Sequence, residues 1–159
     1  MRGPALAVRL LVTIPGNPWA GAINKRDGAT SRGGKARIFK RAGYHEAQDR
    51  AAACIREAVR AQGVAFLRGP VIVTITWYLD RRSWQYDLPS WCPAADVDGP
   101  GKCYLDALRL TLKRGRVTVP GGGALSDDVQ AVDFYQRKRV GTPRATVLVA
   151  RLTERAGAC

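Results

Sequence analysis

Aspartates gather in one part of this chain. Six of the 13 acidic residues fall between positions 96 and 133, and all six are aspartates: Asp96, Asp98, Asp106, Asp127, Asp128 and Asp133. The D-x-D spacing of Asp96 and Asp98 directs both side chains to one face of an extended segment. Carboxylate oxygens are the ligands that Mg²⁺ and Mn²⁺ prefer. This region therefore predicts a site for a hard divalent cation.

A lysine lies inside the same segment. Lys102 follows Asp98 by four residues and precedes Asp106 by four, so on a helix all three side chains would share one face. Asp127 and Asp128 come directly before an expected strand and can return to the same place. A lysine there can offset negative charge on a phosphate, and the carboxylates can hold the metal ions that phosphodiester hydrolysis uses.

Each of these residues also has an ordinary structural interpretation. Asp98 before Gly99-Pro100 is typical of a helix N-cap. Lys102 and Asp106 suit a surface ion pair worth about 0.3–0.5 kcal/mol. Asp127-Asp128 after a glycine-rich stretch is typical of a turn. Capping and turns leave Asp96 and the order of the whole set unexplained, which favours the chemical interpretation.

The charge of the chain indicates its partner. Lys and Arg number 26, the formal net charge is +13, and residues 1–50 hold ten basic residues against three acidic ones. We expect a polyanionic partner, with nucleic acid ahead of an anionic membrane surface because the basic segment has no amphipathic helical period. A protein that only coats phosphates gains nothing from clustered carboxylates, whereas one that cuts phosphodiesters needs both.

Length and composition predict one domain over residues 1–159, with a core over about residues 5–152 and a tail over 153–159. Arg9 interrupts the apolar stretch Ala5–Ile14, so we expect neither a membrane span nor a secretory signal. The four cysteines are therefore expected to be reduced, in the cytoplasm. They form no C-x-x-C pair and the chain has one histidine, so a structural zinc site is not expected.

Hydrophobic periodicity predicts the elements that position these residues. Strands are expected over Ala5–Ile14, Val71–Leu79, Val129–Arg137 and Ala145–Leu152, and helices over Tyr44–Gln62 and Gly99–Lys113. Residues 19–43 are interpreted as a basic loop with a short strand near Ala36–Lys40, and Gly115–Ala124 as a flexible connection. The fold class predicted is α/β of the mixed α+β kind, with a mixed sheet packed against two main helices.

One further loop, Asp80–Ala95, carries three aromatic residues, Trp84, Tyr86 and Trp91, beside two arginines. Their rings either cap the hydrophobic core, which is the favoured interpretation, or stack on unpaired bases.

The chain resembles the RusA-type Holliday junction resolvases, a family of small dimeric endonucleases common in phages and prophages. The family's block D-x-D-N-x-x-K-x-x-x-D-A-L corresponds to Asp96-Val97-Asp98, Lys102 and Asp106-Ala107-Leu108, and its later D-D-x-x-V to Asp127-Asp128. Its opening strand ends in an I-P-G-x-P turn, here Ile14–Pro18. The resemblance covers about residues 8–152. It departs from the family at Gly99, where asparagine is usual, and in a longer Lys113–Ser126 connection.

The resemblance implies a Mg²⁺-dependent endonuclease, with Mn²⁺ able to substitute, that resolves four-way DNA junctions by paired nicks. Asp96, Asp98 and Asp128 would bind the metal, with Asp127 as a further ligand. The catalytic residues would be these first three aspartates, Asp96, Asp98 and Asp128, together with Lys102. A homodimer would supply two equivalent sites. The cytoplasm, that of a bacterial host if a phage encodes the protein, is the expected location, with neither a membrane nor a small molecule as partner.

Phosphate contacts are assigned to the basic residues: Lys25, Arg26, Arg32, Lys35, Arg37, Lys40, Arg41, Lys138 and Arg139. Two alternatives stay open. One is a basic nucleic-acid-binding protein without enzymatic activity, and the other is a nuclease of the same chemistry that prefers flaps or forks.

Overall fold

In the described part of the chain, two α-helices lie among eight β-strands. The computed structural model describes residues 5–18, 26–32, 35–40, 42–64, 66–79 and 100–153. Its elements, in order, are β1 (Ala5–Pro15), β2 (Arg26–Arg32), β3 (Lys35–Lys40), α1 (Ala42–Ala61), β4 (Val71–Leu79), α2 (Gly101–Ala107), β5 (Thr111–Arg114), β6 (Val117–Pro120), the short 3-10 helix η2 (Asp128–Gln130), β7 (Ala131–Val140) and β8 (Arg144–Thr153). This is the mixed α/β content that the sequence predicts.

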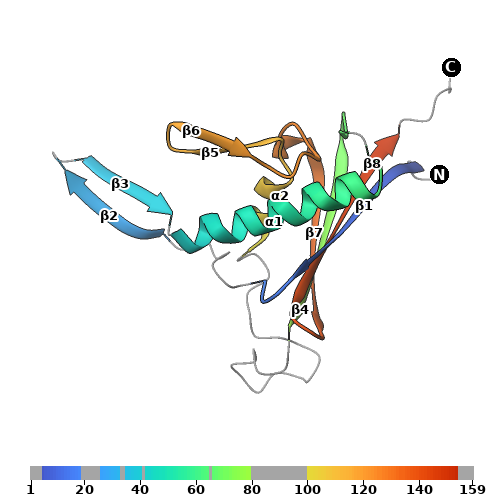
Figure 1. The fold of residues 1–159 in the computed structure, drawn as a ribbon, viewed down its shortest axis with the longest axis horizontal. Coiled ribbons are helices and arrows are strands. Elements are labelled where there is room, and N and C mark those ends of the chain that lie inside the picture. The colour runs from blue at the N-terminus through green and yellow to red at the C-terminus, as the bar shows by residue number, and fades with distance from the viewer. Residues whose placement is uncertain are drawn as a thin grey trace.

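The central sheet has the strand order β1-β8-β4-β7 (Figure 1). β8 pairs antiparallel with both β1 and β4, and β4 pairs parallel with β7. β7 and β8 follow each other in sequence, yet β4 lies between them. The connection crosses the end of β4, where the Gly141 N–H donates to the Leu79 carbonyl at 2.9 Å.

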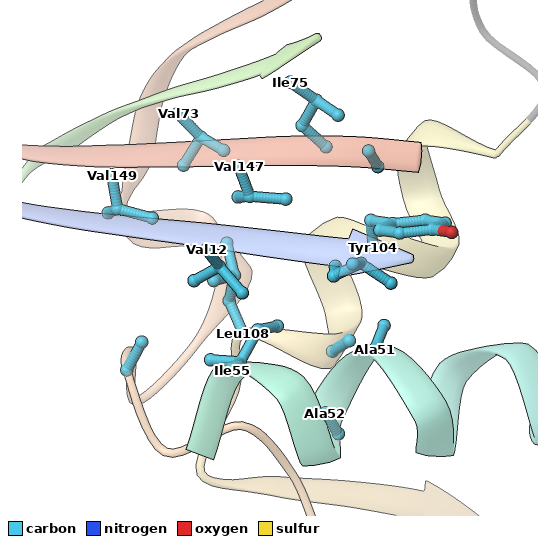
Figure 2. Close-up of a cluster of buried hydrophobic side chains, with 14 of the residues drawn as sticks. Val12, Ala51, Ala52, Ile55, Val73, Ile75, Tyr104, Leu108, Val147 and Val149 are labelled. Atoms are coloured by element: carbon cyan, nitrogen blue, oxygen red, sulfur yellow. The ribbon is translucent and has the colours of Figure 1, made fainter. Parts of the chain in front are cut away.

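The hydrophobic core lies between one face of this sheet and the two helices (Figure 2). Alternate residues of β4, from Val71 to Leu79, are buried, as expected for a strand with period-2 burial. Ala51, Ala52 and Ile55 of α1 pack on that face at helical spacing. Gln62, just after α1, fixes the helix to the sheet. Its side-chain oxygen accepts the Leu11 N–H at 3.1 Å, and its side-chain nitrogen donates to the Leu11 carbonyl at 2.5 Å.

Several predicted elements are confirmed. Helix Tyr44–Gln62 corresponds to α1, and the strands over Ala5–Ile14, Val71–Leu79 and Ala145–Leu152 correspond to β1, β4 and β8. The strand predicted over Val129–Arg137 begins later, because η2 takes up 128–130, and continues to Val140.

The helix predicted over Gly99–Lys113 is wrong beyond Ala107. α2 ends there, and Thr111–Arg114 forms β5, paired antiparallel with β6. The expectation of a flexible connection over Gly115–Ala124 is wrong for the same reason. Gly115 has a φ of +62°, a conformation that glycine adopts without steric cost, and it turns the chain back into the hairpin. Beyond the hairpin, Gly121 to Leu125 donate backbone hydrogen bonds to carbonyls of Ala107 to Leu110.

The basic loop predicted over residues 19–43 contains a strand that the sequence analysis missed. β2 and β3 pair antiparallel, with Arg26 opposite Lys40 and Arg32 opposite Lys35. This hairpin projects from the N-terminal end of α1, away from the central sheet (Figure 1). The short strand near Ala36–Lys40 is confirmed as part of β3.

The Asp80–Ala95 loop, with Trp84, Tyr86 and Trp91, lies outside the described residues. The α-helices within the described ranges include none with the length and apolar character needed to cross a membrane.

Candidate functional site

Lys102 joins two parts of the chain that are distant in sequence. Its ammonium lies 2.7 Å from Asp106 Oδ1, one helical turn along α2. It also contacts Asp128 Oδ2 at the start of η2. Two predictions are therefore confirmed: Lys102 and Asp106 share a face of α2, and the Asp127-Asp128 pair returns to that face.

Arg109 completes this cluster and was missed by the sequence analysis. It follows α2 closely, and its guanidinium donates to Asp127 Oδ2 at 3.2 Å and lies 3.7 Å from Asp128 Oδ1. Its spacing of three residues after Asp106 is a weak signal, because Arg109 lies past the end of the helix. We call Lys102, Asp106, Arg109, Asp127 and Asp128 the charged cluster.

Asp127 also has a local structural role. Its Oδ1 accepts the Val129 N–H at 3.2 Å, and the Gln130 side chain accepts the Asp127 N–H at 3.3 Å. This is a capping box at the start of η2. The turn interpretation of Asp127 is confirmed, and both of its carboxylate oxygens already have partners. Its role as a metal ligand stays a prediction.

Gly101 sets the position of α2 and hence of Lys102. A Cβ at Gly101 would come 2.5 Å from Gln136 Oε1, so a larger residue there would displace the end of the Gln136 side chain. Gln136 Oε1 in turn accepts the indole N–H of the buried Trp77 at 3.3 Å. The Trp77 and Tyr104 rings meet edge to face, with 4.9 Å between centroids. The unusual Gly-Pro-Gly helix start thus has a packing explanation at Gly101.

The cluster holds its charges strongly. The hydrogen bond from Lys102, aided by Asp127 and Arg109, outweighs burial and lowers the pKa of Asp128 to about 2. Burial alone would lower the pKa of Lys102, but its hydrogen bonds to Asp106 and Asp128 raise it instead. At neutral pH the Asp128 carboxylate and the Lys102 ammonium are therefore both ionised.

A polar cavity of about 120 Å³ adjoins the charged cluster between α1 and β5. Its lining residues are Tyr44, His45, Gln48, Asp106, Arg109, Leu112 and Lys113. Burial raises the pKa of Tyr44, which keeps its hydroxyl protonated, and this hydroxyl donates to Asp106 Oδ2 at 3.5 Å. Arg114 holds β5 against α1 by donating to Asp49 Oδ2 at 2.9 Å and to the His45 carbonyl at 3.1 Å.

Two carboxylates of the charged cluster are of the kind that a hard divalent cation prefers. Asp128 supplies an ionised carboxylate, and the Lys102 ammonium bridges Asp106 and Asp128, two carboxylates that a hard cation would also favour. The other predicted ligands, Asp96 and Asp98, lie outside the described residues. Within the ranges 5–79 and 100–153, gaps excepted, no three His, Cys, Asp or Glu side chains are grouped closely enough to hold a metal ion.

The basic residues assigned to DNA fall in two places. Arg26, Arg32, Lys35, Arg37 and Lys40 belong to the β2–β3 hairpin, while Lys25 and Arg41 lie outside the described residues. Lys138 and Arg139 are neighbours on β7, opposite Trp77 and Tyr78 of β4. Successive strand residues face opposite sides of a sheet, so Lys138 is on the helix side and Arg139 on the other.

No protein-family model matches this chain, and no curated protein matches it either.

Proposed function

We propose that this protein is a Mg²⁺-dependent endonuclease that resolves four-way DNA junctions by paired nicks, as its resemblance to the RusA-type resolvases implies. One observation carries the proposal: Lys102 contacts Asp128 across 26 residues of sequence. Two separate segments of the motif thus meet at one point, which neither helix capping nor turn formation requires.

Asp128, Lys102 and Arg109 of the charged cluster each have a role in the proposed reaction. Asp128, with Asp96 and Asp98, would bind the metal ion, which when bound supplies an activated water and neutralises charge at the phosphate. Lys102 would contact the scissile phosphate and offset the charge that grows on it. Arg109 would hold Asp127 and Asp128 in position, as its contacts with both carboxylates indicate.

The remaining parts of the proposal follow from the reaction. Paired nicks in opposed strands need two equivalent sites, which a two-fold homodimer provides. The cations of the β2–β3 hairpin, with Lys138 and Arg139, would bind phosphates of the branched DNA. The cytoplasm, where DNA recombination intermediates occur in bacteria, would be the location.

The test is cleavage of a labelled four-way junction and of a matched linear duplex, with Mg²⁺ and with EDTA. We expect cutting of the junction alone, and only with the metal. Asp128→Asn should reduce the cleavage rate at least about 100-fold, as the loss of an essential electrostatic group does, and should retain junction binding. Glu57→Gln, which removes an exposed carboxylate of α1, serves as the matched control and should cut like the wild type.

The proposal is wrong if Asp128→Asn and Asp96→Asn both cut the junction at the wild-type rate. Flaps and replication forks are tested as further substrates. Faster cutting of one of them would leave the proposed chemistry intact but would show that the junction is not the preferred substrate.

A non-enzymatic nucleic-acid-binding protein is the second candidate, and one observation favours it. Asp127 caps η2 and pairs with Arg109, so this carboxylate is already explained without a metal. Such a protein would bind branched DNA with a steep salt dependence and would leave every strand intact at any Mg²⁺ or Mn²⁺ concentration.

A further inference from the structure

The central sheet has a second face, opposite the one that the helices cover. Strand register places three rows of residues across it. The first row is Leu11, Leu148, Thr74 and Tyr135, the second is Thr13, Thr146, Thr76 and Arg137, and the third is Pro15, Arg144, Tyr78 and Arg139. We call these three rows the outer face.

The outer face is exposed, although its first row contains large apolar side chains. Leu11 is 55% exposed and Tyr135 is 50% exposed, whereas their strand neighbours Leu10 and Val12 are completely or almost completely buried. In β4, Thr74, Thr76 and Tyr78 are half-buried, as expected for a central strand with an uncovered face. Exposed aromatic and aliphatic groups in a row across a sheet are typical of a binding surface.

The charge of the outer face is strongly positive. Arg137 and Arg139 are exposed on β7, and Arg144 lies over the Tyr78 ring at 3.8 Å from its centroid. One row further along, Arg9 and Asp133 occupy the two edge strands, so Asp133 is the one carboxylate that register places beside the cations. Two copies of this face would bring arginines against arginines, which disfavours a dimer formed through it.

We propose that the outer face binds a single-stranded segment of DNA, with the Tyr135 ring stacked on a base and with Arg137 and Arg139 on phosphates. The inference rests on the nucleic-acid-binding part of the proposed function. Aromatic side chains on a sheet surface, flanked by cations, bind single strands in this way because every base has a π-face. Thr76 and Thr146, in the middle row, add hydroxyls that can donate to phosphate oxygens.

The position of β7 connects this surface with the charged cluster. Gln136 faces the helices and supports α2 beside Gly101, while its neighbours Tyr135 and Arg137 face outward. In the described part of the chain, β7 is an edge strand of the central sheet. A strand leaving a branch point could therefore bind on one side of β7 while the scissile phosphate lies on the other.

The experiment measures binding of a labelled single strand of about 20 nucleotides, longer than one platform of this kind covers. EDTA is present, so that cutting does not interfere. Tyr135→Ala should weaken binding at least about five-fold through lost stacking, and Tyr135→Phe, which keeps the ring, should bind like the wild type. Arg137→Gln with Arg139→Gln should weaken binding and make the slope of log K against log salt shallower by about 1.4.

The control is the pair Arg60→Gln and Arg68→Gln, which removes the same charge from exposed arginines outside the outer face. It should bind within about two-fold of the wild type, as expected for cations remote from the strand. Photo-crosslinking to a strand containing 5-iodouracil should label Tyr135. Melting temperatures of all variants establish that they are folded.

Three outcomes overturn the inference. The first is that Tyr135→Ala and the Arg137/Arg139 variant bind the strand as tightly as the wild type. The second is that the crosslink maps to another surface. The third is that Tyr135→Ala converts a dimer to a monomer in sedimentation, which would assign the face to a second copy of the chain. A wild type that binds the strand through Tyr135 yet never cuts a junction would contradict the nuclease proposal and support this inference.

Discussion

Lys102 connects two carboxylates from different parts of the chain, and its ammonium lowers the pKa of one of them. The contact with Asp128 lowers the pKa of that carboxyl to about 2 from an ordinary value of 3.8. A depressed carboxyl pKa stabilises the folded chain at pH values above the ordinary value, and this contribution is lost as the pH falls from about 4 toward 2. The charged cluster is therefore stable at neutral pH and weakens in acid.

Replacing Lys102 should move the titration of Asp128. In metal-free buffer, Lys102→Gln removes the hydrogen bond that lowers the Asp128 pKa most, so that pKa should rise toward 3.8. NMR titration of the carboxyl carbon measures it. Lys113→Gln, at an exposed lysine of β5, is the matched control and should leave Asp128 titrating at about 2. An Asp128 that titrates near 3.8 in the wild type would contradict the cluster geometry.

At the scale of elements, the position of α2 depends on one close approach. Gly101 lies against the Gln136 side chain, which also accepts a hydrogen bond from Trp77. Gly101→Ala should displace the Gln136 amide from the Trp77 indole and lower the free energy of unfolding by about 0.5–1.5 kcal/mol, the usual contribution of one hydrogen bond. Urea denaturation measures the change.

A double-mutant cycle distinguishes this close approach from a general effect of alanine at a helix start. Gln136→Ala removes the atoms that the new Cβ would meet, so the cost of Gly101→Ala should fall by at least about 0.5 kcal/mol in that background. Equal costs in both backgrounds would show that Gln136 does not set the position of α2.

The elements that the sequence predicts well are those with an unbroken hydrophobic period. α1 and β4 each bury one face against the core, and their periods of 3.6 and 2 are visible in the residues. The end of α2 was mispredicted because Leu105, Leu108 and Leu112 keep helical spacing into β5. A tertiary contact ends the helix, because the Leu110 N–H donates to the Leu125 carbonyl at 2.7 Å. β2 was missed because its residues, RDGATSR, have no apolar alternation.

In the candidate site, too, some contacts could be predicted from the sequence and others could not. The Lys102–Asp106 pair depends on local helical spacing, and the segment containing Asp128 belongs to the motif that the chain resembles, so both could be predicted. Arg109 and Gly101 take their roles from contacts with η2 and β7. Those contacts exist only after the chain has folded, and no spacing rule reveals them.

At the scale of the whole molecule, the net charge of +13 separates into surfaces with different roles. Cations of the charged cluster neutralise carboxylates locally, since Lys102 and Arg109 each contact two of them. On the proposed function, we expect the long-range attraction of DNA to come from the cations of the β2–β3 hairpin and the outer face. The hairpin projects from the end of α1, away from the core (Figure 1).

Excision of the hairpin tests this division of charge. Arg26 and Lys40 are partners in the ladder, so their Cα atoms lie about 5 Å apart and a Gly-Gly link can replace residues 27–39 between them. The excision removes three cations and one carboxylate. Because the buried core residues that the structure describes belong to other elements, we expect the melting temperature to fall by no more than about 4 °C, the equivalent of about 1 kcal/mol in a domain of this size.

Duplex DNA binding should respond much more strongly to the same excision. If the three cations contact phosphates, the slope of log K against log salt becomes shallower by about 2.7, and the affinity loss is largest at low salt. A fluorescence anisotropy titration over several salt concentrations measures both. A matched variant that keeps the hairpin and changes Arg32, Lys35 and Arg37 to Gln should reproduce the shallower slope. An unchanged slope in both variants would assign the attraction of DNA to the outer face and the rest of the molecule.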